Sequence, residues 1–262
     1  MTWRYVGASA IGSSHTRAGL PCQDHNEVVV VTNGNGACTL VCVVADGAGS
    51  APNSQVGARI ACRSMVESVK VWWLSPTPVL QPDTVRGWIF DASADITSEA
   101  ELAHLHPKLF ACTLVGAVIT PTRAAYFQVG DGSIVISDND SYAPVFWPEE
   151  TEAANLTYFI TDEEWWAHAQ ITIRESIPSD IAIFTDGLQL LVLDYKSRAA
   201  HSPFFEQMFG QLRKCPAETV TNLCEELRRY LGSEPIMART DDDKSLILAT
   251  NKEAVEAASG RA

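Results

Sequence analysis

The chain has 262 residues, enough for one large domain or two small ones, and its 46% hydrophobic content is typical of a globular protein rather than a disordered one. Its formal net charge is −13, from 19 basic and 32 acidic residues. This charge argues against a nucleic acid or an anionic membrane as partner, because both would repel the protein. Seven cysteines without metal-site spacing, and no long apolar run, predict reduced thiols and a cytoplasmic location.

The first third of the chain is predicted to be mainly β-structure followed by a helix. The segments TWRYVGASA, EVVVVT and CTLVCVVAD have the composition of strands. Asn33-Gly34 and Asn35-Gly36 predict a hairpin between the second and the third of them. After a loop of small residues, a helix is expected to begin near Asn53 or Ser54.

The remainder alternates between helical and β-rich segments. A second helix is predicted from Pro82, because apolar residues then recur at intervals of three and four. Three strand-like segments follow, FACTLVGAVIT, AAYFQVGDG and SIVISD, and the last two are expected to meet at an Asp131-Gly132 turn. IAIFTDG reads as a buried strand, residues 202–231 as mainly helical, and KSLILAT as a final strand.

This order of elements predicts an α+β fold. Strands outnumber helices and mostly connect as hairpins, which favours antiparallel sheets covered by helices over a parallel α/β sheet. No linker is long enough to divide the chain. We therefore expect a single domain over residues 1–262, with a core from about residue 5 to 250 and a frayed tail after Asn251.

Three apolar segments run directly into Asp-Gly, at Asp46-Gly47, Asp131-Gly132 and Asp186-Gly187, and the acidic triplet 241–243 precedes the run SLILA. Carboxylates at strand ends can converge at one rim of a sheet, where their oxygens suit hard cations such as Mg²⁺ or Mn²⁺. Such a rim is typical of a two-metal hydrolase. The alternative is that each Asp-Gly is a two-residue hairpin turn, which needs no metal.

The ordered series of these motifs resembles the metal-dependent protein phosphatases of type 2C (the PPM family), especially their compact bacterial branch. The resemblance extends from about Gly12 to Ala249. A lone Asp-Gly carries no such information, whereas the order of the whole series is specific. The matching motifs are Gln23-Asp24, Asp46-Gly47-Ala48-Gly49-Ser50, Thr113, Gly130-Asp131-Gly132, Thr185-Asp186-Gly187 and Asp242-Asp243-Lys244-Ser245.

The resemblance implies a central sandwich of two antiparallel sheets, with helices on both outer faces and a metal site at one end. It implies that Asp46 bridges two Mg²⁺ or Mn²⁺ ions and that the Gly47 carbonyl binds one of them. Asp186 and Asp242 would complete the ligands of the second ion. Asp24 would lie behind these ligands and hold metal-bound water. Asp131, together with Asp186, would contribute to a third and weaker metal site.

The chain departs from the family pattern at several positions. His15 stands where the family places an arginine that grips the substrate phosphate, and Arg17 follows two residues later, so either could bind phosphate. Ala48 replaces a histidine that eukaryotic relatives carry after the first Asp-Gly. When Asp242-Asp243-Lys244-Ser245 is aligned with the family's Asp-Asn-x-Thr motif, Asp242 is the implied ligand. Asp243 is then its neighbour, and Asp241 lies in solvent.

The function implied by the resemblance is hydrolysis of phosphoserine and phosphothreonine in proteins by a metal-activated water, without a covalent intermediate. The expected partner is a phosphorylated protein, such as a bacterial Ser/Thr kinase or the target of that kinase. Two alternatives remain open. One is an inactive relative that binds phosphoproteins, and the other is a hydrolase of small phosphoesters on the same fold.

Overall fold

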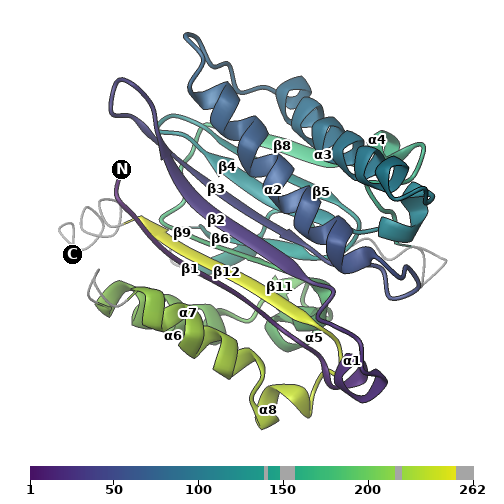
Figure 1. Cartoon of the computed structure of the whole chain (residues 1–262). Coiled ribbons are helices and arrows are strands. Elements are labelled where there is room, and N and C mark those ends of the chain that lie inside the picture. The colour runs from purple at the N-terminus through teal and green to yellow at the C-terminus, as the bar shows by residue number, and fades with distance from the viewer. Residues whose placement is uncertain (139–140, 148–156, 216–219, 252–262) are drawn as a thin grey trace.

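The computed structural model describes residues 1–138, 141–147, 157–215 and 220–251, and two five-stranded sheets lie at its centre (Figure 1). All strand pairs within these two sheets are antiparallel. The first, here called the β1 sheet, has the order β1 (Trp3–Ala10), β12 (Lys244–Asn251), β9 (Asp180–Phe184), β6 (Ser133–Asp138) and β7 (Ser141–Pro144). The second, the β2 sheet, has the order β2 (His25–Thr32), β3 (Cys38–Ala45), β4 (Leu114–Ile119), β5 (Ala124–Val129) and β8 (Gln170–Arg174).

The predicted hairpin between β2 and β3 is confirmed. Its strands pair from His25 opposite Ala45 to Thr32 opposite Cys38. Within the turn, the side-chain oxygen of Asn33 accepts hydrogen bonds from the backbone N–H groups of Asn35 and Ala37, which fixes the reversal that the Asn-Gly pairs predict.

β5 and β6 meet at Asp131-Gly132 as predicted, but they do not form a hairpin. These strands lie in different sheets, so the chain crosses from the β2 sheet to the β1 sheet at Asp131-Gly132. Gly130 and Gly132 both have positive φ, at 90° and 126°, and a Cβ at Gly130 would lie 2.6 Å from the Thr113 side chain. Glycine at these positions therefore permits a sharp crossover rather than a two-residue turn.

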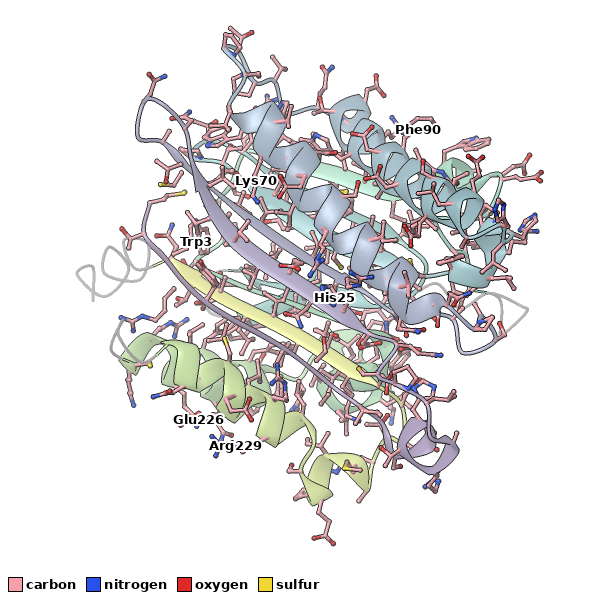
Figure 2. All side chains as sticks on the ribbon, viewed as in Figure 1. Trp3, His25, Lys70, Phe90, Glu226 and Arg229 are labelled. Carbon is pink, nitrogen blue, oxygen red and sulfur yellow. The ribbon has the colours of Figure 1, made fainter. Side chains whose placement is uncertain are left out.

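Helices cover both outer faces of the sandwich (Figure 1). Helices α2 (Ser54–Trp73) and α3 (Pro82–Leu102) pack on the β2 sheet, while α6 (Ser202–Lys214) and α7 (Val220–Leu231) pack on the β1 sheet. In Figure 2, Glu226 and Arg229 project outward from α7, and Phe90 projects from the outer side of α3. The shorter elements are α1 (Ser13–Ala18), η1 (Pro107–Phe110), α4 (Trp165–His168), η2 (Asp186–Leu188), α5 (Gln189–Val192), β10 (Leu193–Asp194), β11 (Ala199–Ala200) and α8 (Glu234–Met237).

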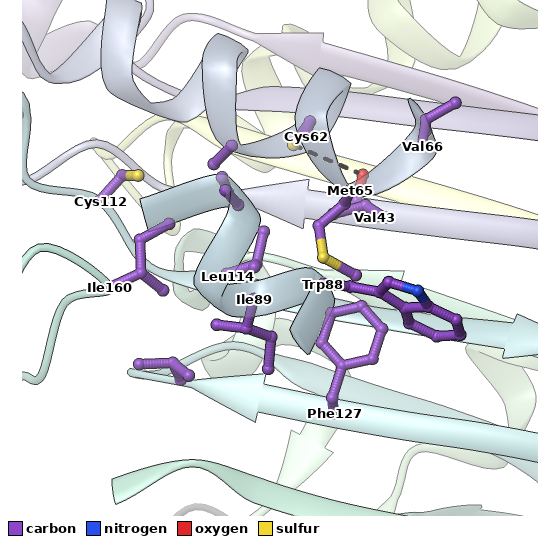
Figure 3. Packing of buried hydrophobic residues seen from close by; sticks show 14 of the residues in the cluster. Val43, Cys62, Met65, Val66, Trp88, Ile89, Cys112, Leu114, Phe127 and Ile160 are labelled. Carbon is purple, nitrogen blue, oxygen red and sulfur yellow. Dashed lines mark hydrogen bonds between the residues drawn. The ribbon is translucent and has the colours of Figure 1, made fainter. Parts of the chain in front are cut away.

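The apolar core has three layers because the central strands are covered on both faces. Along β3, Val41 and Val43 face α2 and α3, whereas Cys42 and Val44 face the other sheet. This explains why the β3 segment is continuously apolar instead of alternating. Figure 3 shows the layer beneath the helices, where Met65 and Trp88 meet the β2 sheet. The predicted α+β sandwich with helices on both faces is thus confirmed.

The tail after Asn251, expected to be frayed, lies outside the described residues. In the part of the chain that is described, no helix combines the length and the apolar character needed to cross a bilayer.

Two helical glycines give a matched test of the packing. A Cβ at Gly57, in α2, would overlap the carbonyl oxygen of Phe110, whereas Gly87, in α3, is exposed with nothing within 4 Å of an added Cβ. Gly57→Ala should lower the free energy of unfolding by about 1–3 kcal/mol through overpacking. Gly87→Ala should raise it by about 0.5–1 kcal/mol through helix propensity. Urea denaturation of both variants measures this, and equal effects would contradict the packing of α2.

Candidate metal centre

The acidic residues selected from the sequence lie at one end of the sandwich, beside the short helix α1. Asp46 and Asp131 follow strands of the β2 sheet, whereas Asp186 follows β9 and Asp242 precedes β12 in the β1 sheet. The antiparallel registers require this convergence, because Phe184, the last residue of β9, pairs with Leu246 near the start of β12. Both sheets therefore contribute carboxylates to the same rim.

None of the three Asp-Gly pairs forms a two-residue hairpin turn. Asp46-Gly47 leads from β3 toward α2, Asp131-Gly132 crosses between the sheets, and Asp186-Gly187 opens η2. The hairpin-turn alternative is therefore wrong at all three positions.

The carboxylates of Asp46, Asp131 and Asp186 form a cluster. One oxygen from each lies within 4.8 Å of the others, and all three residues are half-buried. Oδ1 of Asp131 and Oδ1 of Asp186 are buried in the described structure without a hydrogen-bond donor. A buried anionic oxygen without a partner is costly, and an all-oxygen cluster has the donor chemistry that Mg²⁺ and Mn²⁺ prefer. These residues fit a divalent cation.

The raised pKa values of two aspartates in the cluster also fit a cation site. Burial, followed by the charges of Asp131, Asp242 and Asp24, raises the pKa of Asp186 to about 8. Burial, and then the neighbouring charges of Asp24 and Asp186, also raises the pKa of Asp46 well above its ordinary value. A bound cation would reverse the sign of the local potential and stabilise both carboxylates in their charged form.

Asp24 is a buried carboxylate next to Asp46. Its Oδ2 accepts a 2.7 Å hydrogen bond from Oγ1 of Thr185. Thr185 in turn accepts a hydrogen bond from the backbone N–H of Ser245. Burial raises the pKa of Asp24 to about 6, while hydrogen bonds from Asp46 and Thr185 oppose the rise. Asp24 is thus fixed between the two β1-sheet strands that carry Asp186 and Asp242.

The backbone of Gly47 is held by a bridge to the segment before β4. Gly47 forms an isolated antiparallel bridge with Cys112, flanked by hydrogen bonds from Thr113 N–H to the Asp46 carbonyl and from Ala48 N–H to the Ala111 carbonyl. In such a bridge the central residue directs its own N–H and C=O away from its partner. A Cβ here would lie 2.8 Å from the Gln23 carbonyl oxygen, so the close packing also requires glycine.

The acidic triplet divides into three different environments. The side chain of Asp241 is 69% exposed, Asp242 is half-buried, and Asp243 is buried. Asp242 lies outside the tight three-carboxylate cluster, but its charge contributes to the raised pKa of Asp46 and of Asp186. Burial raises the pKa of Asp242 itself. Its backbone carbonyl accepts a 2.6 Å hydrogen bond from Nζ of the buried Lys244.

The two candidate phosphate-binding residues are placed differently. Nδ1 of His15 lies 2.8 Å from Oδ2 of Asp243, and the His15 side chain is only 14% exposed. Arg17 is 69% exposed and faces Asp241 at 3.4 Å. The geometry therefore ties His15 to the loop that carries Asp242, whereas Arg17 lies on the outer surface of α1.

The contacts that two residues make at the rim are not predicted by the sequence. Thr157 donates a 2.9 Å hydrogen bond to Oδ2 of Asp131, and Asp243 connects α1 to the loop before β2. Thr157 lies far from any Asp-Gly motif, so no sequence signal marks it. Asp243 carries a signal, its place in the triplet, but the triplet alone does not show which aspartate is buried.

Comparison with known proteins identifies the family of this chain. A sequence model of the family described as Protein phosphatase 2C matches residues 11–231. The chain is 34% identical over 256 residues to Serine/threonine-protein phosphatase 3 of Escherichia coli (strain K12), covering 95% of this chain and 98% of that protein. The chain therefore belongs to the protein phosphatase 2C family, as the motif order predicts.

Solved structures with low sequence identity share the fold. The serine/threonine phosphatase Stp1 from Staphylococcus aureus matches with a TM-score of 0.61 and 13% identity, over 96% of each chain. The catalytic domain of the serine threonine protein phosphatase PstP, in complex with two manganese ions, matches with a TM-score of 0.61 and 14% identity, over 95% of this chain and 97% of that one. At these identities the matches establish the fold alone.

The raised pKa of Asp186 predicts how the metal-free protein responds to pH. The folded chain holds a proton on Asp186 up to about pH 8, whereas the unfolded chain releases it near the ordinary value of 3.8. Between these values the folded state binds more protons, so its free energy of unfolding falls as pH rises. Asp186→Asn should weaken this dependence in EDTA-treated protein, measured by urea denaturation from about pH 5 to about pH 8.

The matched control is Asp95→Asn, which removes an exposed carboxylate on α3. This variant should keep the wild-type pH dependence. If Asp186→Asn and Asp95→Asn have the same pH profile, Asp186 is not held in the repulsive environment described above.

Proposed function

We propose that this protein is a metal-dependent serine/threonine protein phosphatase. The observation that carries the proposal is the convergence of Asp46, Asp131 and Asp186, from both sheets, in a chain of the protein phosphatase 2C family. The relative from Escherichia coli, which is named a serine/threonine-protein phosphatase, supports the same reaction. Phosphate monoesters hydrolyse very slowly in water, so the site must supply a large reduction in the barrier.

We propose Mg²⁺ or Mn²⁺ as the cofactor, held as two ions by Asp46, the Gly47 carbonyl, Asp186 and Asp242, with a third site at Asp131 and Asp186. The manganese in the PstP structure and the oxygen-only donor set support this choice. When bound, such ions lower the pKa of water and offset the charge of a phosphoryl group. Without them, the acidic rim would repel a phosphate dianion.

The chain's own residues then bind and orient the substrate. His15 is proposed to contact the phosphate, since it is held at the rim by Asp243. Arg17, on the outside of α1, is the second candidate. Asp24, fixed by Thr185, would hold water in place from behind the ligands. Burial raises the pKa of the Cys22 and Cys112 thiols, so both are poor nucleophiles, in keeping with hydrolysis without a covalent intermediate.

We propose a phosphorylated protein as the substrate, either a Ser/Thr kinase or its target. Neither a nucleic acid nor a membrane is proposed as partner, in view of the net charge of −13. A cytoplasmic location is in keeping with seven free cysteines. We treat residues 1–262 as a single catalytic domain, because both sheets contribute to the rim.

Two single substitutions test the metal ligands. Asp46→Ala and Asp186→Ala should each abolish hydrolysis of p-nitrophenyl phosphate in Mn²⁺, and wild-type activity should disappear in excess EDTA. The melting temperature of the metal-free variants should hold or rise, because each change relieves repulsion. Asp95→Asn, which removes an exposed carboxylate outside the rim, is the control and should keep wild-type activity. A large fall in melting temperature for both alanine variants would mean that these residues support the fold rather than the metal.

The two alternatives are separated by substrate. We expect kcat/KM on phosphoserine and phosphothreonine peptides to exceed that on small phosphometabolites, measured with Mn²⁺ on one panel. A preference for a phosphometabolite would favour the small-phosphoester hydrolase. Well-folded protein that is inactive at every Mn²⁺ and Mg²⁺ concentration, but binds phosphopeptides, would favour the phosphoprotein-binding relative.

A further inference from the structure

Asp243 is a buried carboxylate with hydrogen-bond partners from two separate segments. Its side chain is 1% exposed. Oδ1 accepts a 2.6 Å hydrogen bond from the backbone N–H of Gly12, and Oδ2 accepts one of 2.5 Å from the backbone N–H of Gln23. Oδ2 also lies 2.8 Å from Nδ1 of His15. A single carboxylate therefore connects the start of β12 to α1 and to the segment that carries Asp24.

Helix α1 depends on such contacts because it has six residues and none of them is buried. Its anchors lie in the acidic loop before β12. Besides the bond from Gly12 to Asp243, both the backbone N–H and the side chain of Ser14 donate to the Asp241 carbonyl. Packing against an apolar core therefore does not hold α1, and hydrogen bonds to this loop set its position and that of His15.

The contact with Asp243 also selects the orientation of the His15 ring. An ionised carboxylate can only accept hydrogen bonds, so this contact assigns a hydrogen to Nδ1. Nε2 is then the ring nitrogen that remains for a substrate. Asp242 is a further charged group whose field reaches the ring, while Arg17 and Asp241 pair with one another on the surface.

We propose that Asp243 is a positioning residue for phosphate binding, which holds the His15 ring through Nδ1 so that Nε2 binds the phosphate of the substrate. This inference rests on the proposed phosphatase function and adds a role for Asp243 within it. The same carboxylate, through Gln23 N–H, holds the segment before Asp24. Loss of Asp243 should therefore raise KM through His15 and lower kcat through Asp24.

Asp95, an exposed aspartate on α3, provides a matched control for steady-state kinetics on a phosphothreonine peptide with Mn²⁺. Asp243→Asn keeps the size of the side chain but places an amide opposite backbone donors, and it should raise KM about tenfold to a hundredfold, the range for one hydrogen bond to a charged group. Asp95→Asn makes the same chemical change at an exposed position away from α1. It should leave KM within about twofold, which is below the effect of such a bond.

A double-mutant cycle shows whether Asp243 acts through His15. His15→Ala should raise KM by a similar factor, and adding Asp243→Asn to it should raise KM no further, although kcat should still fall. If the two substitutions multiply their effects on KM, Asp243 does not act through His15, and the proposal is overturned.

A second readout does not depend on activity or on the variant folding. In wild-type protein loaded with Mg²⁺, the ¹⁵N resonances of His15 should show a hydrogen on Nδ1, and adding inorganic phosphate should shift the Nε2 resonance. An Nε2 resonance that does not respond to saturating phosphate would overturn the proposal. Wild-type protein inactive on every phosphopeptide would instead remove the proposed function, so the two failures are distinguishable.

Discussion

Carboxylates at one end of the sandwich repel one another, and the fold has to hold them in place against this repulsion. Two like charges about 4 Å apart repel by about 4 kcal/mol at an effective dielectric constant of 20. Here Asp46, Asp131 and Asp186 approach within 4.8 Å, and Asp24 and Asp242 add to the same field. A chain free to relax would separate these groups. The strand ends prevent this, and the charges of the neighbouring aspartates add to burial in raising the pKa of Asp46 and of Asp186.

The separation of the two sheets therefore determines how far apart the carboxylates of the rim lie. Asp46 and Asp131 belong to the β2 sheet, and Asp186 and Asp242 to the β1 sheet, so the layer between the sheets sets the distance across the rim. That layer consists of fully buried side chains such as Val44, Ile183 and Ile247. A close-packed interior has little compressibility, so it can hold carboxylates that repel one another at a fixed distance. The helices outside the sheets then shield these strands from water.

The sequence predicts the strands, the main helices and the acidic rim because these depend on local patterns. A buried strand ending in Asp-Gly, as at Asp46 and Asp186, marks both a strand end and a carboxylate. Long-range pairing is not a local property, which is why the predicted turn at Asp131-Gly132 does not reveal that β5 and β6 belong to different sheets. The burial of Asp243 likewise depends on Gly12 and Gln23, which lie more than 200 residues away.

If the acidic rim holds divalent cations, a crystal of the protein soaked in Mn²⁺ should contain manganese there. Anomalous diffraction recorded near the manganese absorption edge shows where the ions lie. The account predicts anomalous peaks among the carboxylates of Asp46, Asp131, Asp186 and Asp242, with a peak in contact with Asp46. Clear electron density for these four side chains at saturating Mn²⁺, but no anomalous peak among them, would contradict it.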